Sequence, residues 1–390
     1  MKELGQKDLI SMIIDLDQYL IKDSFSGWDP YDTILSKRIP FRKLGRWFSV
    51  LATQAQKRNP INIRNLIGVP KGINPKAMGL FLHAYSILYK KTNERRFLER
   101  AHYFYHWLVE HPSKGYQGIS WGYNFPWVSP LKSLEAYTPS SVVTGFIVRA
   151  MIEYLPISQE KQNVKNTILG ASQFVYHELK RTRFSQGLAI SYTPIKRDVC
   201  YNASLLAAEI LAFSCQLNQV KEFEEIAIKS VEFVISRQFS NGRWNYSYDL
   251  TKEIEREQVD FHQGYILESI YNIRQCLKVK DKRWEEAIEK GIKFYLGQQF
   301  HKSGWGYRRL PRKYPVDIHN QSQGIITSKR LVNYHDDGLV YHNRILEWTL
   351  LNMYDQRGYF YYQKHRLYTI RIPYVRWNNA WMMLALSTSL

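Results

Sequence analysis

The sequence has little cysteine and no long apolar run, and these absences exclude several classes of protein. Its 390 residues include three cysteines, Cys200, Cys215 and Cys276, which are too few for a disulfide framework and never lie in CxxC spacing. The longest apolar stretch, 203–215, is interrupted by Glu209 and is shorter than the about 18 residues that a membrane-spanning helix needs. The N-terminal residues are charged and lack the apolar centre of a secretory signal. We therefore expect a protein of the reducing cytoplasm.

Acidic residues are scarce relative to basic ones, whereas aromatic residues are abundant. Lysine and arginine number 54 against 35 aspartate and glutamate residues, which gives a formal net charge of +19. Aromatic residues make up 15% of the chain, more than a core needs, and such rings often line sugar or nucleobase sites. The composition favours an anionic partner: nucleic acid, an anionic inner-membrane surface, or an acidic sugar or oligosaccharide. Nucleic acid is the least favoured, because no nucleic-acid-binding motif is recognisable and the charges are dispersed.

An internal repeat is the strongest structural signal in the sequence. Six segments combine a polar, kinked start with an apolar run of about four helical turns. Their spacings are 64, 64, 60, 58 and 59 residues. Asn, Thr and Ser are common helix N-caps, and helices that are apolar nearly all round are typically buried. The six anchor residues are Asn74, Thr138, Asn202, His262, Asn320 and Asn379.

Amphipathic, charged helices are expected between these buried ones. Long connections with glycine and aromatic residues lead into the apolar helices, and short polar connections lead out of them. This alternation predicts an all-α fold, an (α/α)6 toroid that forms one domain over residues 1–390, with the long loops on one face. An open solenoid of helix pairs is the alternative. The expected outer helices lie at about 41–57, 93–111, 160–181, 220–238, 282–300 and 340–356, preceded by a helix at 7–22.

In a closed toroid, the N-terminal helix and residues 40–57 should pack against residues 340–390. Six inner-helix N-termini would then meet at one end of the lumen, where their unpaired N–H groups attract anions. The long loops would bring aromatic rings to the same end, which suits a sugar with a carboxylate, phosphate or sulfate group. Packing of the rings on the helix ends is the alternative. The rings expected there are Trp28, Trp121, Tyr123, Trp127, Tyr137, Trp244, Trp305, Tyr307 and Trp377.

Four motifs resemble those of one protein family. GWDPYD at 27–32, GVPKGINPKAMGL at 68–80, WGYNFPW at 121–127 and YTPSS at 137–141 are similar to the VpsJ-type proteins of bacterial exopolysaccharide and capsule loci. The resemblance covers most of the chain and is clearest over 25–145. It implies the toroid of the terpenoid-cyclase and prenyltransferase-like superfamily and a role in making surface polysaccharide, but it supplies no catalytic residue. We expect residues 1–38, which include WDPYD, to close over the lumen.

The chemistry of terpenoid cyclases is not supported by the sequence. Residues 238–244 fit the QxxxGxW repeat of that superfamily, but the nearest approach to its acidic motif is Asp15–Asp17 on the N-terminal helix. Cys200 has no partners for the zinc triad of a prenyltransferase. A group of His and Asp side chains falls on a turn at the opposite face, so we expect neither a metal nor a cofactor. That group is His335, Asp336, Asp337 and His342.

Ionisable side chains near the inner-helix starts supply the candidate chemistry. Proton abstraction at C5 of a uronate needs a His or Tyr base, and Arg or Asn groups that neutralise the sugar carboxylate. Two histidines on successive helices, each two residues after an aspartate, are expected to face one sugar. The same aspartates also fit helix caps, and the histidines also fit a buried core. The candidate catalytic residues are Asp198, Tyr201, Asp260, His262 and His319.

Three functions remain open at this point. The charge balance favours a uronate epimerase or lyase. An inverting glycoside hydrolase, which needs two carboxylates across the scissile bond, and a non-catalytic polysaccharide-binding or scaffold protein are the alternatives. Other groups are expected to hold the substrate in each case. They are Asp29, Asp32, Arg197, Asn320 and Arg376.

Overall fold

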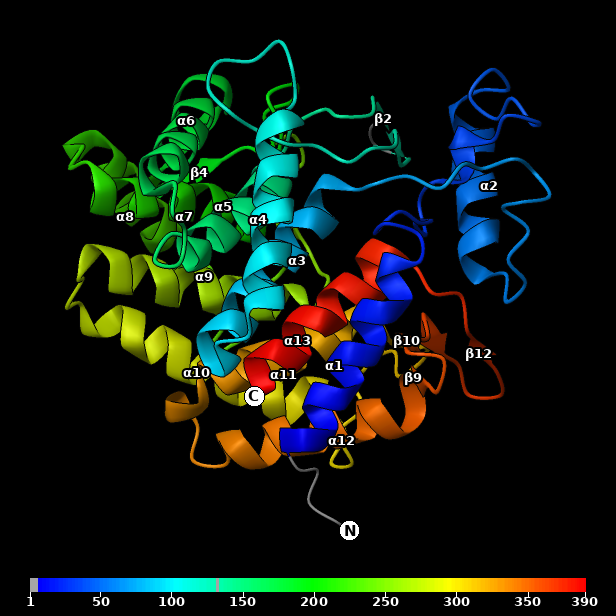
Figure 1. Cartoon of the computed structure of the whole chain (residues 1–390). Helices are drawn as coiled ribbons and strands as arrows, with labels where there is room; N and C mark the ends of the chain where they lie inside the picture. Colours follow the sequence, from blue (N-terminus) through cyan, green and yellow to red (C-terminus); the bar gives the residue numbers. More distant parts are fainter. Residues whose placement is uncertain (1–5, 131–132) are drawn as a thin grey trace.

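The inner ring of helices is closed. The computed structural model describes residues 6–130 and 133–390, which are mostly helical (Figure 1). Each inner helix packs against the next, and the last packs against the first. The predicted (α/α)6 toroid is therefore confirmed, and an open solenoid is excluded. The inner helices are α3 (Pro75–Thr92), α5 (Ser141–Tyr154), α7 (Tyr201–Leu217), α9 (His262–Leu277), α11 (Ile318–Arg330) and α13 (Trp381–Ser389).

The outer ring contains the N-terminal helix, and not residues 41–57 as the sequence suggested. Tyr85 of α3 donates a hydrogen bond to Asp17, and Tyr354 donates one to Asp15 over 3.2 Å. These contacts seat the N-terminal helix between the two ends of the array. The helix at 46–58 instead lies outside both rings (Figure 1). The outer helices are α1 (Gln6–Ile21), α4 (Arg95–Glu110), α6 (Lys161–Glu178), α8 (Lys221–Ile235), α10 (Lys282–Gln299) and α12 (Gly338–Met353), and the displaced one is α2 (Arg46–Arg58).

One glycine in each of five long loops shows how the outer ring closes. These glycines have positive φ, and a Cβ on each would collide with a backbone carbonyl oxygen of the next outer helix. The last of them, Gly358, lies against the Asp15 carbonyl of α1. Helix α1 therefore occupies the sixth outer position. The preceding members of the series are Gly118 on α6, Gly187 on α8, Gly242 on α10 and Gly304 on α12.

The inner helices begin near the predicted anchors. Asn74 caps α3 by accepting from Lys76 N at 3.0 Å, with Pro75 in the first turn. The observed caps of α5 and α11 are Ser140 and Asp317, two residues after and three residues before the expected anchors. Helix α13 follows a π-helical turn, η3 (Val375–Ala380). Helix ends are the least certain part of a sequence-based assignment.

The long loops pair with one another through short antiparallel strands, which the sequence did not indicate. The pairing of Cys200 with Ser247 joins two successive loops, and that of Asp317 with Gln363 joins two others. These strands fix the loop face over the inner-helix N-termini. The pairs and sheets are β1 (Trp127–Val128) with β2 (Ser133–Leu134); β3 (Arg181–Phe184) with β4 (Gly187–Ile190); β5 (Val199–Cys200), β6 (Ser247–Asp249) and β7 (Ile254–Arg256); β8 (Val316–Asp317), β11 (Gln363–Lys364) and β12 (Thr369–Ile370); and β9 (Tyr354–Asp355) with β10 (Tyr359–Phe360). Two 3-10 turns, η1 (Thr33–Leu35) and η2 (Val332–Tyr334), complete the described elements.

We expect Gly242→Ala to destabilise the fold by about 2–3 kcal/mol, because its φ is +92° and a Cβ would lie 2.1 Å from the Lys290 carbonyl oxygen. Gly45→Ala is the matched control, because Gly45 has φ +99° but open space around it. It should cost only the conformational term of about 1 kcal/mol. Urea unfolding of both variants measures the difference, and equal losses would mean that the loop can move away from α10.

Candidate active site

The lumen mouth on the loop face contains a histidine oriented by a carboxylate. His262 opens α9, and its Nδ1 lies 2.5 Å from Oδ1 of Asp260. Its side chain is 17% exposed, and its Nε2 makes no hydrogen bond to a described residue. An ionised carboxylate accepts a hydrogen bond from Nδ1–H, so Nε2 is left as the free acceptor. The pair can therefore receive a proton at a defined atom.

Asp260 is held in its ionised form. Gln258 donates to its Oδ2 at 2.8 Å, and Arg309 Nε lies 3.7 Å from the same oxygen. Burial alone would raise the pKa of Asp260, but His262, its hydrogen bonds and Arg309 together lower that pKa below its ordinary value. Asp260 is thus a positioning group for the imidazole and not a proton donor.

The second candidate histidine lies deeper and is separated from the first by a phenylalanine ring. Phe261 stacks on His262 at 4.2 Å and on His319 at 4.4 Å between ring centroids. His319 is buried, and its Nε2 shares a 2.5 Å hydrogen bond with the Tyr265 hydroxyl. Burial, with the charges of Lys76 and Arg376, lowers the pKa of His319 well below its ordinary value. His319 is therefore neutral, and it does not face the open mouth beside His262.

Aromatic rings continue from the histidines across the mouth. Trp377 lies 4.6 Å from His319 and 5.5 Å from Tyr31, and Tyr31 packs on Trp127 at 4.4 Å. On the other side, Tyr246 lies 4.8 Å from His262. A curved wall of rings beside a basic nitrogen can hold the apolar face of a sugar.

Cations lie among these rings. Lys57 Nζ of α2 lies 3.8 Å from the Tyr31 ring centroid, and burial lowers the pKa of this lysine to about 7. Lys76 is 2% exposed, and its Nζ lies 4.2 Å from the ring centroid of Phe146 and 5.2 Å from that of Trp381. Burial lowers the pKa of Lys76 well below its ordinary value. Sequence reasoning missed both lysines.

The WDPYD segment is fixed to the mouth by two buried ion pairs. Arg376 donates from Nε and Nη2 to Asp29 at 2.5 and 2.8 Å, and Arg64 Nε donates to Asp32 at 2.7 Å. Burial raises the pKa of Asp32 to about 6, although Arg64 opposes this shift. The tyrosine of the motif, Tyr31, reaches the aromatic wall. Residues 29–32 of the N-terminal segment thus contact Arg376 and the aromatic wall.

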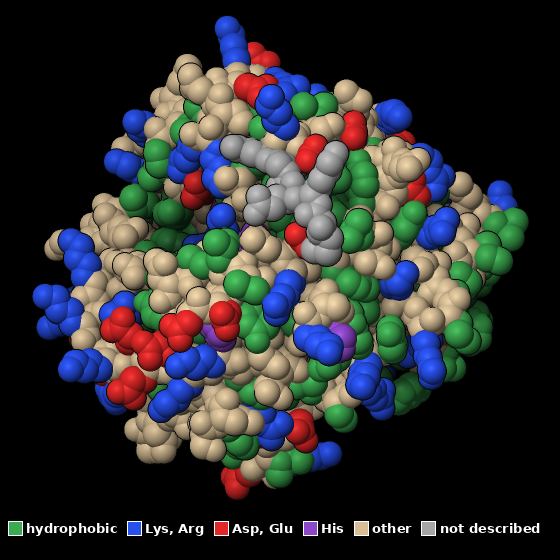
Figure 2. All heavy atoms as spheres, turned by 90° about the horizontal axis from the view of Figure 1, so that it is seen from below, with side chains coloured by type: hydrophobic (Ala, Val, Ile, Leu, Met, Phe, Trp, Pro, Cys, Tyr) green, Lys and Arg blue, Asp and Glu red, His purple; other side chains and the backbone are tan. Residues whose placement is uncertain are grey.

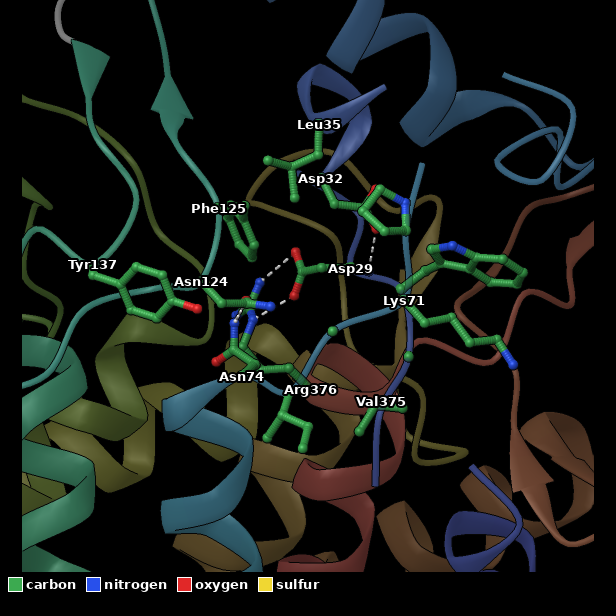
Figure 3. A pocket seen from close by; sticks show the side chains of 15 residues that line it. Asp29, Asp32, Leu35, Lys71, Asn74, Asn124, Phe125, Tyr137, Val375 and Arg376 are labelled. Carbon is green, nitrogen blue, oxygen red and sulfur yellow. Dashed lines mark hydrogen bonds and ion pairs between the residues drawn. The ribbon is translucent and has the colours of Figure 1, made fainter. Parts of the chain in front are cut away.

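A cavity of about 290 Å³ lies beside this segment. Figure 3 shows the carboxylate of Asp29 facing the Arg376 guanidinium, with Asn74 and Asn124 beside them. Asn74 donates to Asn124 at 2.7 Å. Tyr137 and Trp28, two expected substrate-binding rings, line the same cavity. Asp29 is paired with Arg376, and Asp32 is paired with Arg64. These ion pairs form part of the cavity wall, and none of the three cavity-lining side chains, Asp29, Asp32 and Arg376, has an unpaired charge for a ligand.

Two of the tryptophans that we expected to bind substrate are packing residues. Trp121 donates its indole N–H to the Leu108 carbonyl at 2.9 Å, and Trp244 donates to that of Val234 at 2.8 Å. Both side chains are fully buried against the ends of outer helices. The tryptophan of the QxxxGxW motif, Trp244, thus holds a loop to the outer ring, which corrects the expected role of both residues.

Other expected residues also lie away from the mouth. Tyr201 donates to Glu255 at 2.8 Å and packs on Phe233 of the outer ring, so it does not reach His262 as a proton donor. Arg197 is exposed on a loop, and Asp198 accepts from the Tyr192 backbone N–H at 2.8 Å.

The loop between α10 and α11 is also stabilised by its own contacts. Asn320 is buried and donates to the Tyr307 carbonyl at 3.0 Å, which is a structural contact. Trp305 packs with His301 and Tyr314 of its own loop, at 4.9 and 5.2 Å between ring centroids. By contrast, Tyr123 does reach the mouth, where its ring lies 4.9 Å from the Arg376 guanidinium.

Charged side chains join the inner helices in the part of the lumen beyond the aromatic rings. Arg149 of α5 pairs with Glu209 of α7 at 2.5 Å, and with Glu268 of α9 at 3.3 Å. Three inner helices are thereby joined at the centre of the ring. The described residues contain no group of three or more His, Cys, Asp or Glu side chains that could hold a metal ion.

Comparison with known proteins identifies the fold. No known family profile and no curated protein matches the sequence. A possible member of the GH105 family from Klebsiella pneumoniae has a TM-score of 0.69 at 10% identity, covering 100% of this chain and 94% of its own. An unsaturated glucuronyl hydrolase specific for heparin has a TM-score of 0.63 at 13% identity, with coverage of 98% and 96%. Cellobiose 2-epimerase from Bacillus thermoamylovorans has a TM-score of 0.62 at 14% identity, with coverage of 82% and 88%.

Proposed function

We propose that the protein is a carbohydrate-active enzyme that removes a proton from an acidic sugar at the lumen mouth. The observation that carries this proposal is the pairing of His262 with Asp260, which leaves Nε2 as a free acceptor on a partly exposed side chain. The fold supports it, because toroids of this kind include a cellobiose 2-epimerase and a glucuronyl hydrolase specific for heparin. Fold alone does not fix chemistry, so the argument depends on the site.

The reaction begins with proton transfer to His262. Nε2 takes the proton from the carbon next to the sugar carboxylate, and the electron pair of the broken C–H bond moves into the carboxylate as an enolate. Cationic groups stabilise that developing charge, and Arg309, which is 44% exposed and lies 3.7 Å from Asp260, is a cation beside the His262–Asp260 pair. Delivery of a proton from water to the opposite face gives the epimer, and His262 releases its proton to water. Alternatively, the C4 substituent leaves with its bonding electron pair and takes a proton from water, which gives an unsaturated product, and His262 again releases its proton to water.

An inverting hydrolase is less well supported by the carboxylates at the mouth. Such an enzyme needs one protonated carboxyl group and one free carboxylate that activates water. Asp260 and Asp29 are held by cationic or imidazole donors. Asp317 accepts from Trp377 and Gln363. None of the three is placed as a free acid or base.

The natural substrate in this proposal is an acidic oligosaccharide of a surface polymer. The WDPYD and GVPKGINPK motifs, which resemble those of VpsJ-type proteins, support this choice. The net charge of +19 also favours an anionic saccharide over a neutral one. A non-catalytic binding protein would use the same aromatic wall, but it would have no need for the oriented imidazole.

Incubation with uronate oligosaccharides in D2O tests the proposal. We expect deuterium at C5 of the uncleaved sugar from an epimerase, or an unsaturated product from a lyase, both read by NMR and mass spectrometry. Neutral oligosaccharides of equal length are the control and should remain unlabelled. Cleavage to saturated products without deuterium at C5 would identify a hydrolase, and binding without any reaction would identify a binder. Either result would overturn proton abstraction as the function.

A further inference from the structure

Helix α2 is folded with its polar side inward. Ser49, Thr53 and Gln56 lie on one face of this helix and are only 2–4% exposed. Ser49 and Thr53 donate to backbone carbonyls, at 3.0 Å to that of Phe41 and 2.8 Å to that of Ser49. A helix on the surface of a protein normally buries its apolar face instead. Of the four residues that α2 buries, only Val50 is apolar, so the helix departs from this rule.

The apolar face of α2 is exposed. Its three large side chains, Trp47, Phe48 and Leu51, lie at i, i+1 and i+4, so they form one continuous stripe on the helix. Exposed stripes of this kind mark surfaces that bind a partner or a membrane. Two more apolar residues of the following loop, Ile61 and Leu66, are each 68% exposed. The stripe consists of Trp47 (60% exposed), Phe48 (46%) and Leu51 (65%), and Leu44 (55%), in the turn before the helix, is exposed as well.

The chain around this stripe carries charge of one sign. Between Asp32 and Glu94 the sequence contains no acidic residue. The stretch does contain many basic residues, and most of them are exposed. Acidic side chains from outside the stretch pair with two of these basic residues, Glu135 with Arg42 at 2.6 Å and Asp23 with Lys71 at 2.7 Å. The exposed basic residues of this stretch near α2 are Lys37, Arg38, Arg42, Lys43, Arg46, Arg58 and Lys71.

The stripe lies on a part of the molecule that stands apart from the rings. Figure 1 shows α2 at the right, separated from α3 and α13. In the view from below, hydrophobic and basic side chains gather at the right-hand edge, on the side where α2 lies (Figure 2). A flat partner could reach this edge without contacting the outer helices.

We propose that α2 and its flanking loops dock the protein onto the surface of an anionic lipid bilayer. Trp and Phe side chains favour the interfacial region of a bilayer, and surrounding Lys and Arg side chains bind anionic headgroups. The same charge argues against a second copy of the chain as the occupant, because two such faces would repel each other. Within the described residues no helix has the length and apolar character to cross a bilayer.

Docking would place the lumen mouth beside the bilayer. Helix α2 packs against η1 and β1, and its Lys57 lies over Tyr31 of the aromatic wall. Saccharides carried at the membrane surface would then meet the mouth. The docking proposal does not depend on the proposed chemistry, because it rests on α2 alone.

Co-sedimentation of the full-length protein with vesicles tests this inference. We expect the protein to bind phosphatidylcholine vesicles that contain phosphatidylglycerol, and to bind pure phosphatidylcholine vesicles about ten-fold or more weakly. Raised salt should release it from the anionic vesicles. Equal partitioning to both vesicle types, or none to either, would overturn the proposal.

A double variant and its control distinguish docking through α2 from non-specific hydrophobic adsorption to vesicles. The double variant Trp47→Gln/Leu51→Gln should lower anionic-vesicle binding about ten-fold or more, whereas Leu351→Gln/Leu367→Gln, at side chains 78% and 92% exposed elsewhere, should not change it. Light scattering of the unliganded protein provides the other decisive measurement. If the wild type is a dimer, the α2 variant is a monomer and neither binds vesicles, the stripe is a self-association surface and the lipid proposal fails.

The charge of the patch has its own test. Lys43→Glu/Arg46→Glu should abolish the preference for anionic vesicles and remove the effect of salt. Arg95→Glu/Lys302→Glu makes the same change in net charge at exposed positions on α4 and a distant loop. This control pair should keep the preference. Equal losses in both pairs would show that only the net charge matters, and would contradict a specific docking face.

Discussion

Replacement of His262 by Gln should lower turnover of an acidic sugar about 10³-fold, while the melting temperature changes little. The side chain lies at the lumen mouth, and its one hydrogen-bonded side-chain partner is Asp260. Glutamine can still accept or donate there, but it has no basic nitrogen to receive a proton. Steady-state kinetics beside a thermal melt separates loss of chemistry from loss of fold.

Asp260→Asn provides the companion measurement for the histidine. Asparagine can present its amide N–H to Nδ1 and so favour the wrong tautomer, as expected for a positioning residue. The rate should fall less than for His262→Gln, and its pH profile should shift. His301→Gln is the matched control, because His301 lies on a loop of the same face and bonds Ser303 at 2.7 Å. Wild-type rates in His262→Gln would remove this residue from the mechanism.

The architecture could be predicted because it depends on repeated local signals. The inner helices are apolar on every side, and Asn74 with Pro75 forms a clear helix start that the structure confirms. The error in the outer ring has a definite cause. Helical periodicity shows that residues such as Trp47 and Leu51 form an apolar stripe, but it does not show whether the rest of the fold packs against that stripe. In this chain the apolar side of α1 is buried against the rings, whereas the stripe of α2 is exposed.

The site was only partly predictable for a similar reason. The sequence placed Asp260 and His262 at one helix start, as a helix cap and a group that faces the lumen, but it did not indicate that their side chains pair. Composition could not distinguish Trp244, whose N–H bonds an outer helix, from Trp377, which lies in the mouth. The buried Lys76 was missed because lysine side chains are usually exposed to solvent. Its place within an apolar helix and the lack of acidic residues from 33 to 93 were the available signals.

Asp29→Asn should destabilise the protein by about 3–5 kcal/mol, the largest stability loss that we expect from a single polar substitution in the N-terminal segment. Asp29 and Arg376 are 5% and 2% exposed, and two hydrogen bonds at 2.5 and 2.8 Å join them. The variant leaves the Arg376 guanidinium buried without a countercharge. Urea unfolding followed by circular dichroism measures the loss.

A matched pair within the same segment distinguishes burial from charge alone. Asp23 and Lys71 form an ion pair at 2.7 Å, but their side chains are 50% and 38% exposed. Solvent already screens this pair, so Asp23→Asn should cost less than about 1 kcal/mol. Similar losses in the two variants would mean that water reaches Arg376 once Asp29 is replaced, and that the segment opens locally. Arg376 also lies over Tyr123 and Trp377. Local opening of the segment would therefore move these two rings and lower the affinity for sugar. If the segment stays closed in Asp29→Asn, the affinity for sugar should change little although the stability falls.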